Sequence, residues 1–255
     1  MKLSGSVLFF VFFFMIMPGH AWTQKSEPDY FLFDKDGEPV AKFEHAVFFG
    51  IRQKLSDTAW EWKYYNIAGP LITVETYRDQ EMTIPHGYIA WFDSGGKIDS
   101  SGSTNRGRKD GTWYYWTDSL TAWKKEDFSN GKLIRSVDEK TMKAEREANL
   151  SKELEPVDKE ADFPGGIKAW VKYLEKNLTF PQRAENLQRE GTVVVSFKVN
   201  TSGKLEDIRI AISREYSLDE EALRLIRNSP RWEPAVQGEK KVNAYRRQPL
   251  TFALQ

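Results

Sequence analysis

Few of the residues that commonly carry catalysis are spaced as a known reaction requires. Asp34 and Asp36 precede Gly37 in the manner of the first ligands of a calcium-binding loop, but no complete ligand set follows at the required positions. We therefore interpret this segment as a turn. Only His45 and His86 follow the N-terminal leader, which is too few for a histidine metal cage. We expect His86 to be a loop residue rather than a base.

The remaining nucleophile and carboxylate patterns are equally sparse. The chain has no cysteine, so a disulfide framework, a thiolate zinc site and a cysteine nucleophile are excluded. It also lacks the Gly-x-Ser-x-Gly, His-Glu-x-x-His and phosphate-loop motifs. Glu220 and Glu221 are expected on the exposed start of a helix, where the helix dipole favours acidic side chains. We predict a non-enzymatic protein with no metal or cofactor; a carbohydrate-active enzyme with a distant carboxylate pair is the alternative.

The composition and the N-terminus favour an exported protein. The 37 basic and 37 acidic side chains balance, so no net field favours nucleic acid. Lys2 is followed by an apolar run from Val7 to Met17 and by the small residues Gly19 and Ala21. This run is shorter than the about 20 residues that span a bilayer, and the pattern is typical of a signal peptide over residues 1–21. We expect the mature chain in the periplasm; an uncleaved leader that anchors it in the inner membrane is the alternative.

Aromatic residues and turn signals dominate residues 25–137. Three similar stretches place Trp62, Ile89 and Trp113 in register, at intervals that suggest stacked hairpins, and Asn130-Gly131 is an expected hairpin turn. The pattern resembles the MORN-type repeat and its antitoxin-like variants, which implies an antiparallel β-repeat domain. Its aromatic side chains either form the core of the sheet, as strand propensity favours, or line a platform for a glycan or a protein.

A charged segment, residues 138–160, follows this region. Opposite charges three or four residues apart favour an exposed helix, which Pro156 would end. At ~1.5 Å per residue, such a helix reaches only about 27 Å. We therefore expect a helical linker that acts as a spacer between two domains.

Residues 161–255 combine helix and strand periods, as expected of an α+β domain. Apolar residues spaced three and four apart predict one buried helix face from Ile167 to Leu178, including Val171. A second helix is predicted to begin at Ser217, which would form a capping box with Glu220.

Three strands are predicted in the same part of the chain. Alternating apolar residues predict a strand over 193–199 and a return strand over 205–212, with an irregular step at Glu206 and Asp207. A last strand is predicted from Val242 onward. Pro249 cannot donate to a ladder, so this strand is expected at or near a sheet edge. The predicted order is helix, strand, strand, helix, strand.

Several local motifs in residues 161–255 resemble the C-terminal domain of the TonB energy-transducer family. They are Phe163-Pro164-Gly165-Gly166, Phe180-Pro181, Leu218-Asp219 and Trp232-Glu233-Pro234-Ala235. The resemblance implies that an accessible strand near the C-terminus receives a short segment of an outer-membrane TonB-dependent receptor as an added strand.

Carried over by position, the resemblance implies a set of partner-binding residues. They are Val242, Asn243, Ala244, Tyr245, Arg246, Arg247 and Gln248 on the strand, with Phe180, Pro181, Gln182 and Arg183 beside it. Leu218-Asp219 and Trp232 to Ala235 are interpreted as scaffold. Arg246 and Arg247 would either meet a receptor carboxylate or serve as solvated edge charges that resist aggregation.

The implied function is transport and energy transduction across the envelope of a Gram-negative bacterium, with inner-membrane proton-driven motor proteins as further partners and a homodimer left open. The chain departs from the family pattern because its apolar leader is short and its eleven prolines are scattered. The alternative is a stand-alone periplasmic scaffold, or a protein that binds proteins or glycans through its repeats.

Overall fold

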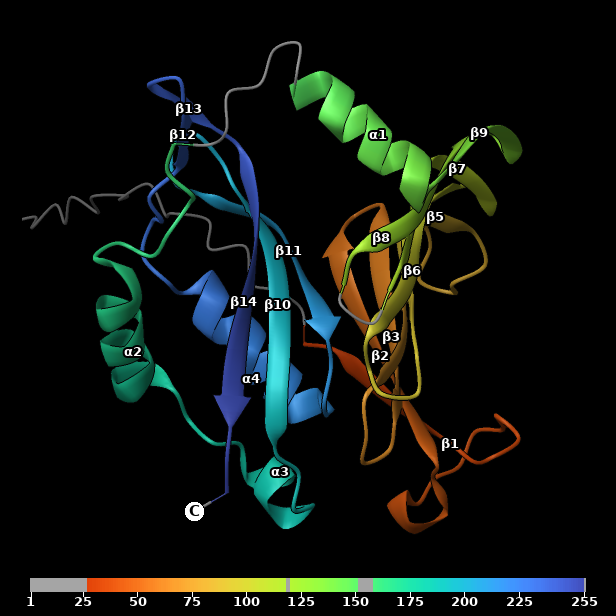
Figure 1. Cartoon of the computed structure of the whole chain (residues 1–255). Helices are drawn as coiled ribbons and strands as arrows, with labels where there is room; N and C mark the ends of the chain where they lie inside the picture. The colour runs from red at the N-terminus through yellow and green to blue at the C-terminus, as the bar shows by residue number, and fades with distance from the viewer. Residues whose placement is uncertain (1–26, 118–119, 151–157, 255) are drawn as a thin grey trace, which may run out of the picture.

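The computed structural model describes residues 27–117, 120–150 and 158–254. Within them lie a nine-stranded antiparallel sheet, a three-stranded antiparallel sheet accompanied by helices, and a small two-stranded sheet (Figure 1). The α+β class with a large N-terminal antiparallel sheet is confirmed. The predicted signal peptide lies outside the described residues.

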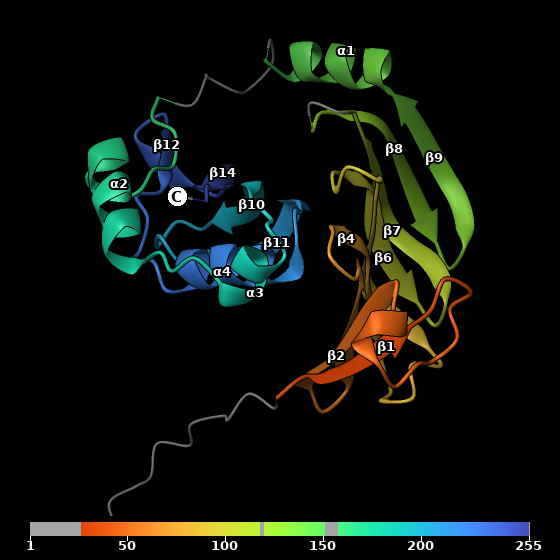
Figure 2. The ribbon, with the colours of Figure 1, turned by 90° about the horizontal axis from the view of Figure 1, so that it is seen from below.

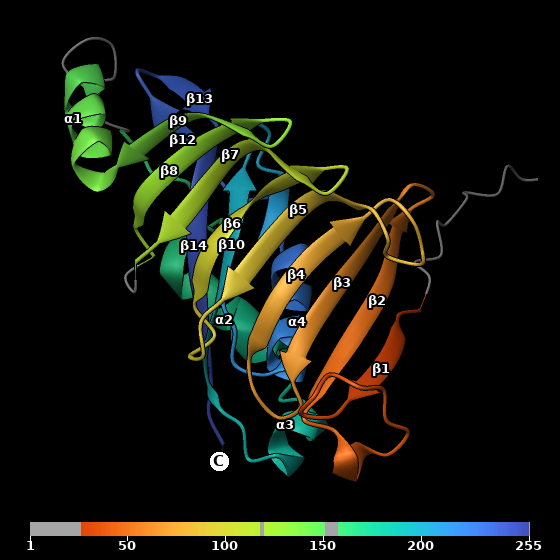
Figure 3. The same ribbon diagram turned by 90° about the vertical axis from the view of Figure 1, so that its right-hand side faces the viewer.

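The nine-stranded sheet is a simple meander in which each strand pairs with the next one in sequence (Figure 3). Asn130 and Gly131 have φ values of 48° and 85° in the turn between its last two strands, so the predicted hairpin turn is confirmed. The likeness to MORN repeats stays a prediction. The strands are β1 (Asp29–Phe33), β2 (Phe48–Ser56), β3 (Ala59–Asn66), β4 (Leu71–Tyr77), β5 (Pro85–Phe92), β6 (Ile98–Asn105), β7 (Arg108–Trp116), β8 (Ala122–Ser129) and β9 (Lys132–Asp138).

The C-terminal part alternates helices and strands, and its main sheet has the order β11-β10-β14. This agrees with the predicted order of helix, strand, strand, helix, strand, apart from the short helix α3 and the hairpin of β12 and β13. The elements are α2 (Gly166–Asn177), α3 (Gln182–Asn186), β10 (Gly191–Val199), β11 (Leu205–Ile212), α4 (Tyr216–Arg227), β12 (Ala235–Gln237), β13 (Lys240–Val242) and β14 (Ala244–Phe252).

The irregular step predicted in the second strand is present. The pairing of β10 with β11 shifts between Ser196 and Lys198, opposite Asp207, whose φ is 53°. The predicted last strand is instead divided: Val242 ends β13, and β14 begins only at Ala244. The sequence signal missed this break because the apolar and polar residues alternate through it without interruption.

Two details of the predicted helices are wrong. The buried side of α2 carries Trp170, whereas Ile167 and Val171 are 69% and 46% exposed. The predicted capping box at Ser217 is absent, because the N-cap of α4 is Glu215, two residues earlier, and its side chain accepts from the Ser217 amide. The carboxylate of Glu215 thus accepts from the Ser217 amide, which the side chain of Glu220 was expected to serve.

The charged segment forms α1 (Glu139–Leu150), which continues directly from β9. Asp138 caps it by accepting from the Thr141 amide at 2.8 Å, and Arg135 of β9 pairs with Glu145. Residues 151–157 lie outside the described part, so the predicted end near Pro156 stays a prediction. The interpretation of residues 138–160 as the boundary between two domains also stays a prediction.

The predicted spacer role is wrong, because the two parts of the chain pack directly on each other. The nine-stranded sheet curves around the C-terminal part (Figure 2). A single hydrophobic cluster joins Phe49, Tyr65 and Leu71 of the large sheet to Leu218 and Leu223 of α4. Burial of apolar surface is the main favourable term in folding, so a shared core holds the two parts together irrespective of the linker.

The aromatic side chains of the large sheet lie on both of its faces. Tyr65 is fully buried against the C-terminal part. Trp113 is 1% exposed, and its ring covers Gly102, where a Cβ atom would come within 2.3 Å of it. Trp91 stacks on Trp113 at 5.5 Å and remains 37% exposed. The core interpretation therefore holds for Tyr65 and Trp113, and a platform for a glycan or protein stays a prediction.

Candidate partner-binding edge

Strand β14 lies at the edge of the three-stranded sheet. Its nine residues pair antiparallel with β10 from Gly191–Phe252 to Val199–Ala244, without a register shift. No other described strand pairs with it. A long edge strand presents a row of unpaired amides and carbonyls, which is a template for another extended segment.

Pro249 indicates which amides of β14 point away from the sheet. A proline is tolerated on an edge strand where its missing N–H would face outward. In an antiparallel strand every second residue shares that orientation. Arg247 and Tyr245 therefore offer their amides to the open side, while Arg246 is bonded toward β10.

The side chains of β14 alternate between two different environments. Tyr245 is 73% exposed. The Arg247 guanidinium, on the same face as Tyr245, lies 5.6 Å from the ring centre of Trp116 in β7, and burial lowers the pKa of Arg247. On the opposite face, Ala244 packs on the main hydrophobic cluster, and the Nε atom of Arg246 is buried with no hydrogen-bond partner among the described residues.

The second group of predicted partner-binding residues is mostly engaged within the chain. Phe180 packs edge-to-face on Phe252, and Pro181 is the N-cap of α3. Gln182 donates to Glu185 and Asn186 at 3.0 Å in the same helix.

Arg183 is committed to the interface with the large sheet. Its Nε donates to Glu215 at 2.6 Å, and a terminal nitrogen donates to the carbonyl of Ile67. Its guanidinium also lies 5.0 Å from the ring centre of Phe49. The side chain of Arg183 is therefore bonded within the chain, at the contact between the two sheets.

The other edge strand, β11, leads into the nine-stranded sheet. Ile212 forms a β-bridge with Lys97, and the Ser213 amide donates to the Gly96 carbonyl at 2.7 Å. The guanidinium of Arg214 donates to the Gly95 carbonyl at 3.1 Å. Gly96 has a φ of 77°, and a Cβ atom there would lie 2.4 Å from the Ser213 oxygen. Only glycine permits this close approach.

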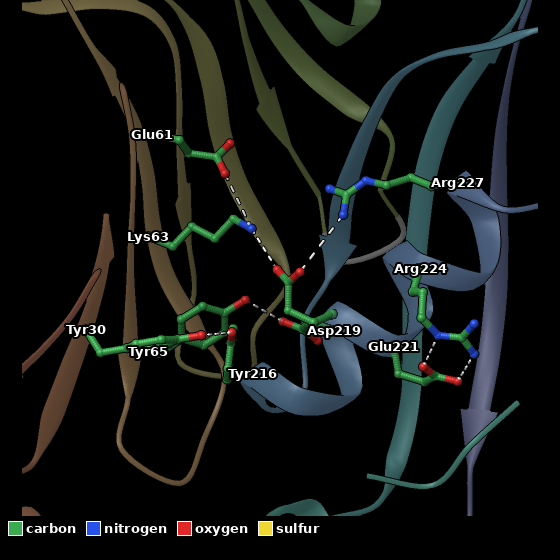
Figure 4. A network of polar contacts seen from close by, with 10 residues as sticks. Tyr30, Glu61, Lys63, Tyr65, Tyr216, Asp219, Glu221, Arg224 and Arg227 are labelled. Carbon is green, nitrogen blue, oxygen red and sulfur yellow. Dashed lines mark hydrogen bonds and ion pairs between the residues drawn. The ribbon is translucent and has the colours of Figure 1, made fainter. Parts of the chain in front are cut away.

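A buried carboxylate lies where the two parts of the chain meet (Figure 4). Asp219, in the first turn of α4, is fully buried and accepts from the Tyr65 hydroxyl at 3.1 Å, the Ser213 hydroxyl, and the Arg214 amide at 3.1 Å. Burial raises the pKa of Asp219 to about 7 and Glu215 adds to the rise, although the three hydrogen bonds act in the opposite direction.

A lysine bridges the same interface beside Asp219. Lys63 of β3 is buried and lies 2.8 Å from Glu220 and 3.4 Å from Glu61. Burial alone would lower the pKa of Lys63, but the two carboxylates outweigh it and raise the pKa above its ordinary value. The expectation that Glu220 and Glu221 are exposed is wrong: Glu220 pairs with Lys63, and Glu221 is buried and accepts from the Thr179 amide at 2.8 Å.

Asp219 gives a prediction for the pH dependence of stability. Its pKa in the folded protein, about 7, exceeds the ordinary value of 3.8, so the folded state holds the proton more tightly than the unfolded state. Its contribution to the free energy of unfolding is therefore present near pH 4 and is lost as the pH rises through 7. We expect Asp219→Asn, which mimics the protonated acid, to remove a dependence on the order of a few kcal/mol. Urea unfolding at pH 4.5 and 7.5 measures it as the difference between the two proteins.

The pH dependence of stability has to be compared between the Asp219→Asn variant and the unmodified chain, because other carboxylates change the stability with pH in the opposite direction. The pKa of Glu206 is lowered by hydrogen bonds from Lys198 and Asn200, and the stability that it contributes is lost as the pH falls. Identical pH profiles of the variant and the unmodified chain would contradict the assignment to Asp219.

The segments considered for catalysis belong to a turn and a strand. Asp34 accepts from the amides of Asp36 and Glu38, so the predicted turn is confirmed. His86 lies in β5 rather than in the predicted loop, and its Nδ1 is buried with no hydrogen-bond partner among residues that the structure describes. In residues 27–117, 120–150 and 158–254, no group of three or more acidic, histidine or cysteine side chains is arranged to hold a metal ion.

A known protein family matches the C-terminal part of the chain, which contains β14. The family model for the C-terminal domain of the Gram-negative bacterial TonB protein matches residues 176–254, which run from the end of α2 through β14. Residues 176–254 are a TonB C-terminal domain. A solution structure of the TonB C-terminal domain of Helicobacter pylori is 24% identical, with 36% of this chain and 87% of that chain covered and a TM-score of 0.28. No curated protein matches the chain.

The TonB C-terminal domain is a transport-related family without enzymatic activity, and its members interact with outer-membrane TonB-dependent receptors in the bacterial envelope. The predicted recognition of residues 161–255 is thus confirmed for 176–254. Within the described ranges, no helix combines the length and the apolar content that crossing a membrane requires.

The residues that join the TonB domain to the large sheet were missed from the sequence. Lys63, Tyr65 and Ser213 each bond to a residue more than a hundred positions away, and the sequence gives no local signal for such a partner. One signal was available: Lys63 and Glu61 are charged residues inside a strand rich in aromatic residues, which indicates a buried ion pair.

Proposed function

We propose that this protein receives an extended segment of an outer-membrane TonB-dependent transporter alongside β14, by β-strand addition. The observation that carries the proposal is the position of β14 in the TonB domain. It is an edge strand nine residues long, and its only strand neighbour in the described structure is β10. Backbone hydrogen bonds would supply affinity, and alternate side chains would supply selectivity.

The packing of the large sheet favours β14 over β11 as the edge strand that receives the transporter segment. The end of β11 is bonded to the turn before β6 through Ile212 and Ser213. A visiting strand would have to displace these contacts to pair along that end of β11. At β14 it meets outward amides of Tyr245 and Arg247 and an exposed tyrosine side chain.

In this proposal, residues 244–248 of β14 form the receiving segment. Val242 and Asn243 lie before β14 and fix its start: the Asn243 side chain accepts from the Thr201 amide at 3.2 Å. Phe180 supports the far end through Phe252. Gln182 and Arg183 are left out of the receiving segment because their side chains are bonded within the chain.

The proposed role is energy-dependent transport across the envelope. The membership of residues 176–254 in the TonB C-terminal family supports it. Coupling to inner-membrane motor proteins is the more specific part of this proposal, and it depends on how the protein is held at that membrane. Fractionation with N-terminal sequencing of the mature chain tests this part, since a cleaved, freely periplasmic form contradicts a direct anchor.

Substitution of Tyr245 by proline tests strand addition. Proline removes an outward amide of β14 and places a ring where the partner strand would lie, while the bonds to β10 are kept. We expect at least about tenfold weaker binding of a transporter-derived peptide, because one backbone hydrogen bond is lost and the approach is obstructed. Titration with amide chemical shifts of residues 244–248 measures it.

Tyr245→Ala is the matched control, since it removes the side chain and keeps the amide. We expect it to bind the peptide far more tightly than Tyr245→Pro does. Equal affinity of the proline variant and the unmodified chain, or peptide-induced shifts confined to other elements, would contradict addition at β14.

A further inference from the structure

The edge strand contains a buried donor, the Nε atom of Arg246, that no described residue of the chain accepts from. We propose that the segment received at β14 places an acidic side chain against Arg246, and that this residue selects partners with a carboxylate at that position. The inference rests on the proposed strand addition. It adds a chemical requirement on the partner that the strand pairing itself does not impose.

Arg246 lies on the face of β14 that packs on the C-terminal core. Its cross-strand neighbour is Phe197, which is fully buried and packs edge-to-face on Trp232 at 4.8 Å. Ala244 and Leu250, at even spacing along β14, are on this face and belong to the same core. The side chain of Arg246 therefore begins among apolar neighbours, and the Nε atom is shielded from water.

A buried Nε without an acceptor is unfavourable in the unpaired protein. A guanidinium has five N–H donors and no acceptor of its own, so the acceptor has to come from another group. Phe197, on the β10 side, offers no side-chain acceptor. No described residue serves as an acceptor for this atom either.

The open side of β14 is where an acceptor can come from. Side chains opposite each other on neighbouring strands have Cβ atoms about 4.5–5.5 Å apart, so an added strand would place one residue beside Arg246 on the same face. A carboxylate fits best, because it can accept two hydrogen bonds from the guanidinium and its charge strengthens both. A residue one place along the added strand points to the other face and cannot do this.

The neighbouring arginine provides a matched comparison. Arg247 points to the opposite face, where its guanidinium lies near the Trp116 ring of the large sheet. It carries the same charge at almost the same place on the edge. Long-range attraction for an acidic peptide should therefore depend on both arginines, whereas the positional requirement should depend on Arg246 alone.

The test uses the isotope-labelled full chain and a designed peptide series. The host is an acetylated peptide of about eight alternating threonine and valine residues, which favours an extended strand. Glutamate, or in a parallel series glutamine, replaces one residue at a time. Binding constants come from titrations, and amide shifts of β14 report where each peptide binds.

We expect one glutamate position, or positions of one parity only, to bind about tenfold more tightly than the matching glutamine peptide. Arg246→Gln should abolish this preference, and Arg247→Gln should keep it. Arg246→Lys keeps the charge but lacks the Nε donor, so this variant should retain only part of the preference for glutamate over glutamine. The comparison of glutamate and glutamine on the unmodified chain decides the matter even if a variant folds poorly.

Two negative results have different meanings. If peptides shift the β14 amides but glutamate and glutamine bind equally at every position, or if the preference survives in Arg246→Gln, the requirement for a carboxylate is overturned and strand addition stands. If neither series shifts the β14 amides, both the requirement and the proposed function are overturned.

Discussion

Replacement of Arg183 by alanine is expected to lower the free energy of unfolding by about 3–5 kcal/mol. Glu215 is fully buried, and its carboxylate is paired with the Arg183 Nε at 2.6 Å. Without Arg183, that carboxylate keeps only the amide and hydroxyl of Ser217, at 2.8 and 2.5 Å. An uncompensated buried charge is far more unfavourable than a lost surface ion pair. Urea unfolding followed by tryptophan fluorescence measures the change.

A double variant separates the missing partner from the missing volume. Arg183→Met with Glu215→Gln removes both charges and keeps side chains of similar length, so we expect most of the lost stability to return. The sequence resemblance instead assigns Arg183 to the partner. An Arg183→Ala protein of unchanged stability that no longer binds peptide would favour that assignment over the structural role.

Substitution of Trp113 by alanine is expected to destabilise the protein by about 3–5 kcal/mol. The ring is almost completely buried over Gly102, stacks on Trp91, and donates from its Nε1 to the Ser103 carbonyl at 3.0 Å. The Lys109 ammonium also lies 4.2 Å from the ring centre. Alanine would leave a cavity over the glycine and remove both the stacking and the cation–π contact. The midpoint of thermal or urea unfolding reports the loss.

Trp123 is the matched control within the same sheet. It is 45% exposed, so Trp123→Ala should change stability by no more than about 1 kcal/mol. Similar effects of the two substitutions would contradict a specific role of Trp113 in the packing of the sheet.

Local patterns in the sequence predicted the elements of the TonB domain well. The alternation over residues 193–199 corresponds to β10, and the proline at position 249 indicated an edge strand, as β14 is. These signals are local: a strand with one buried face alternates, and a proline has no amide to donate, which confines it to edge strands. They are readable without any knowledge of the rest of the chain.

What the sequence left undetermined depends on contacts between distant residues. Tyr65 donates to Asp219 across 154 positions of sequence, and Arg183 and Ile67 are 116 positions apart. The periodicity of α2 and α4 does not tell whether a given face of either helix is exposed to solvent or covered by a sheet. Hence the periodicity could not show that Ile167 is exposed, that Glu221 is buried, or that the linker does not separate the two parts.

The contact between the end of β11 and the large sheet determines how a mechanical force applied at β14 would be transmitted through the molecule. A segment held along β14 and pulled parallel to that strand loads the bonds to β10 in shear, so many bonds resist together. Behind β10, the force reaches Ser213, which is tied to Gly96 and accepts from the Leu71 amide at 2.8 Å. A force applied at β14 is thereby distributed over the nine-stranded sheet as well as over the three-stranded sheet.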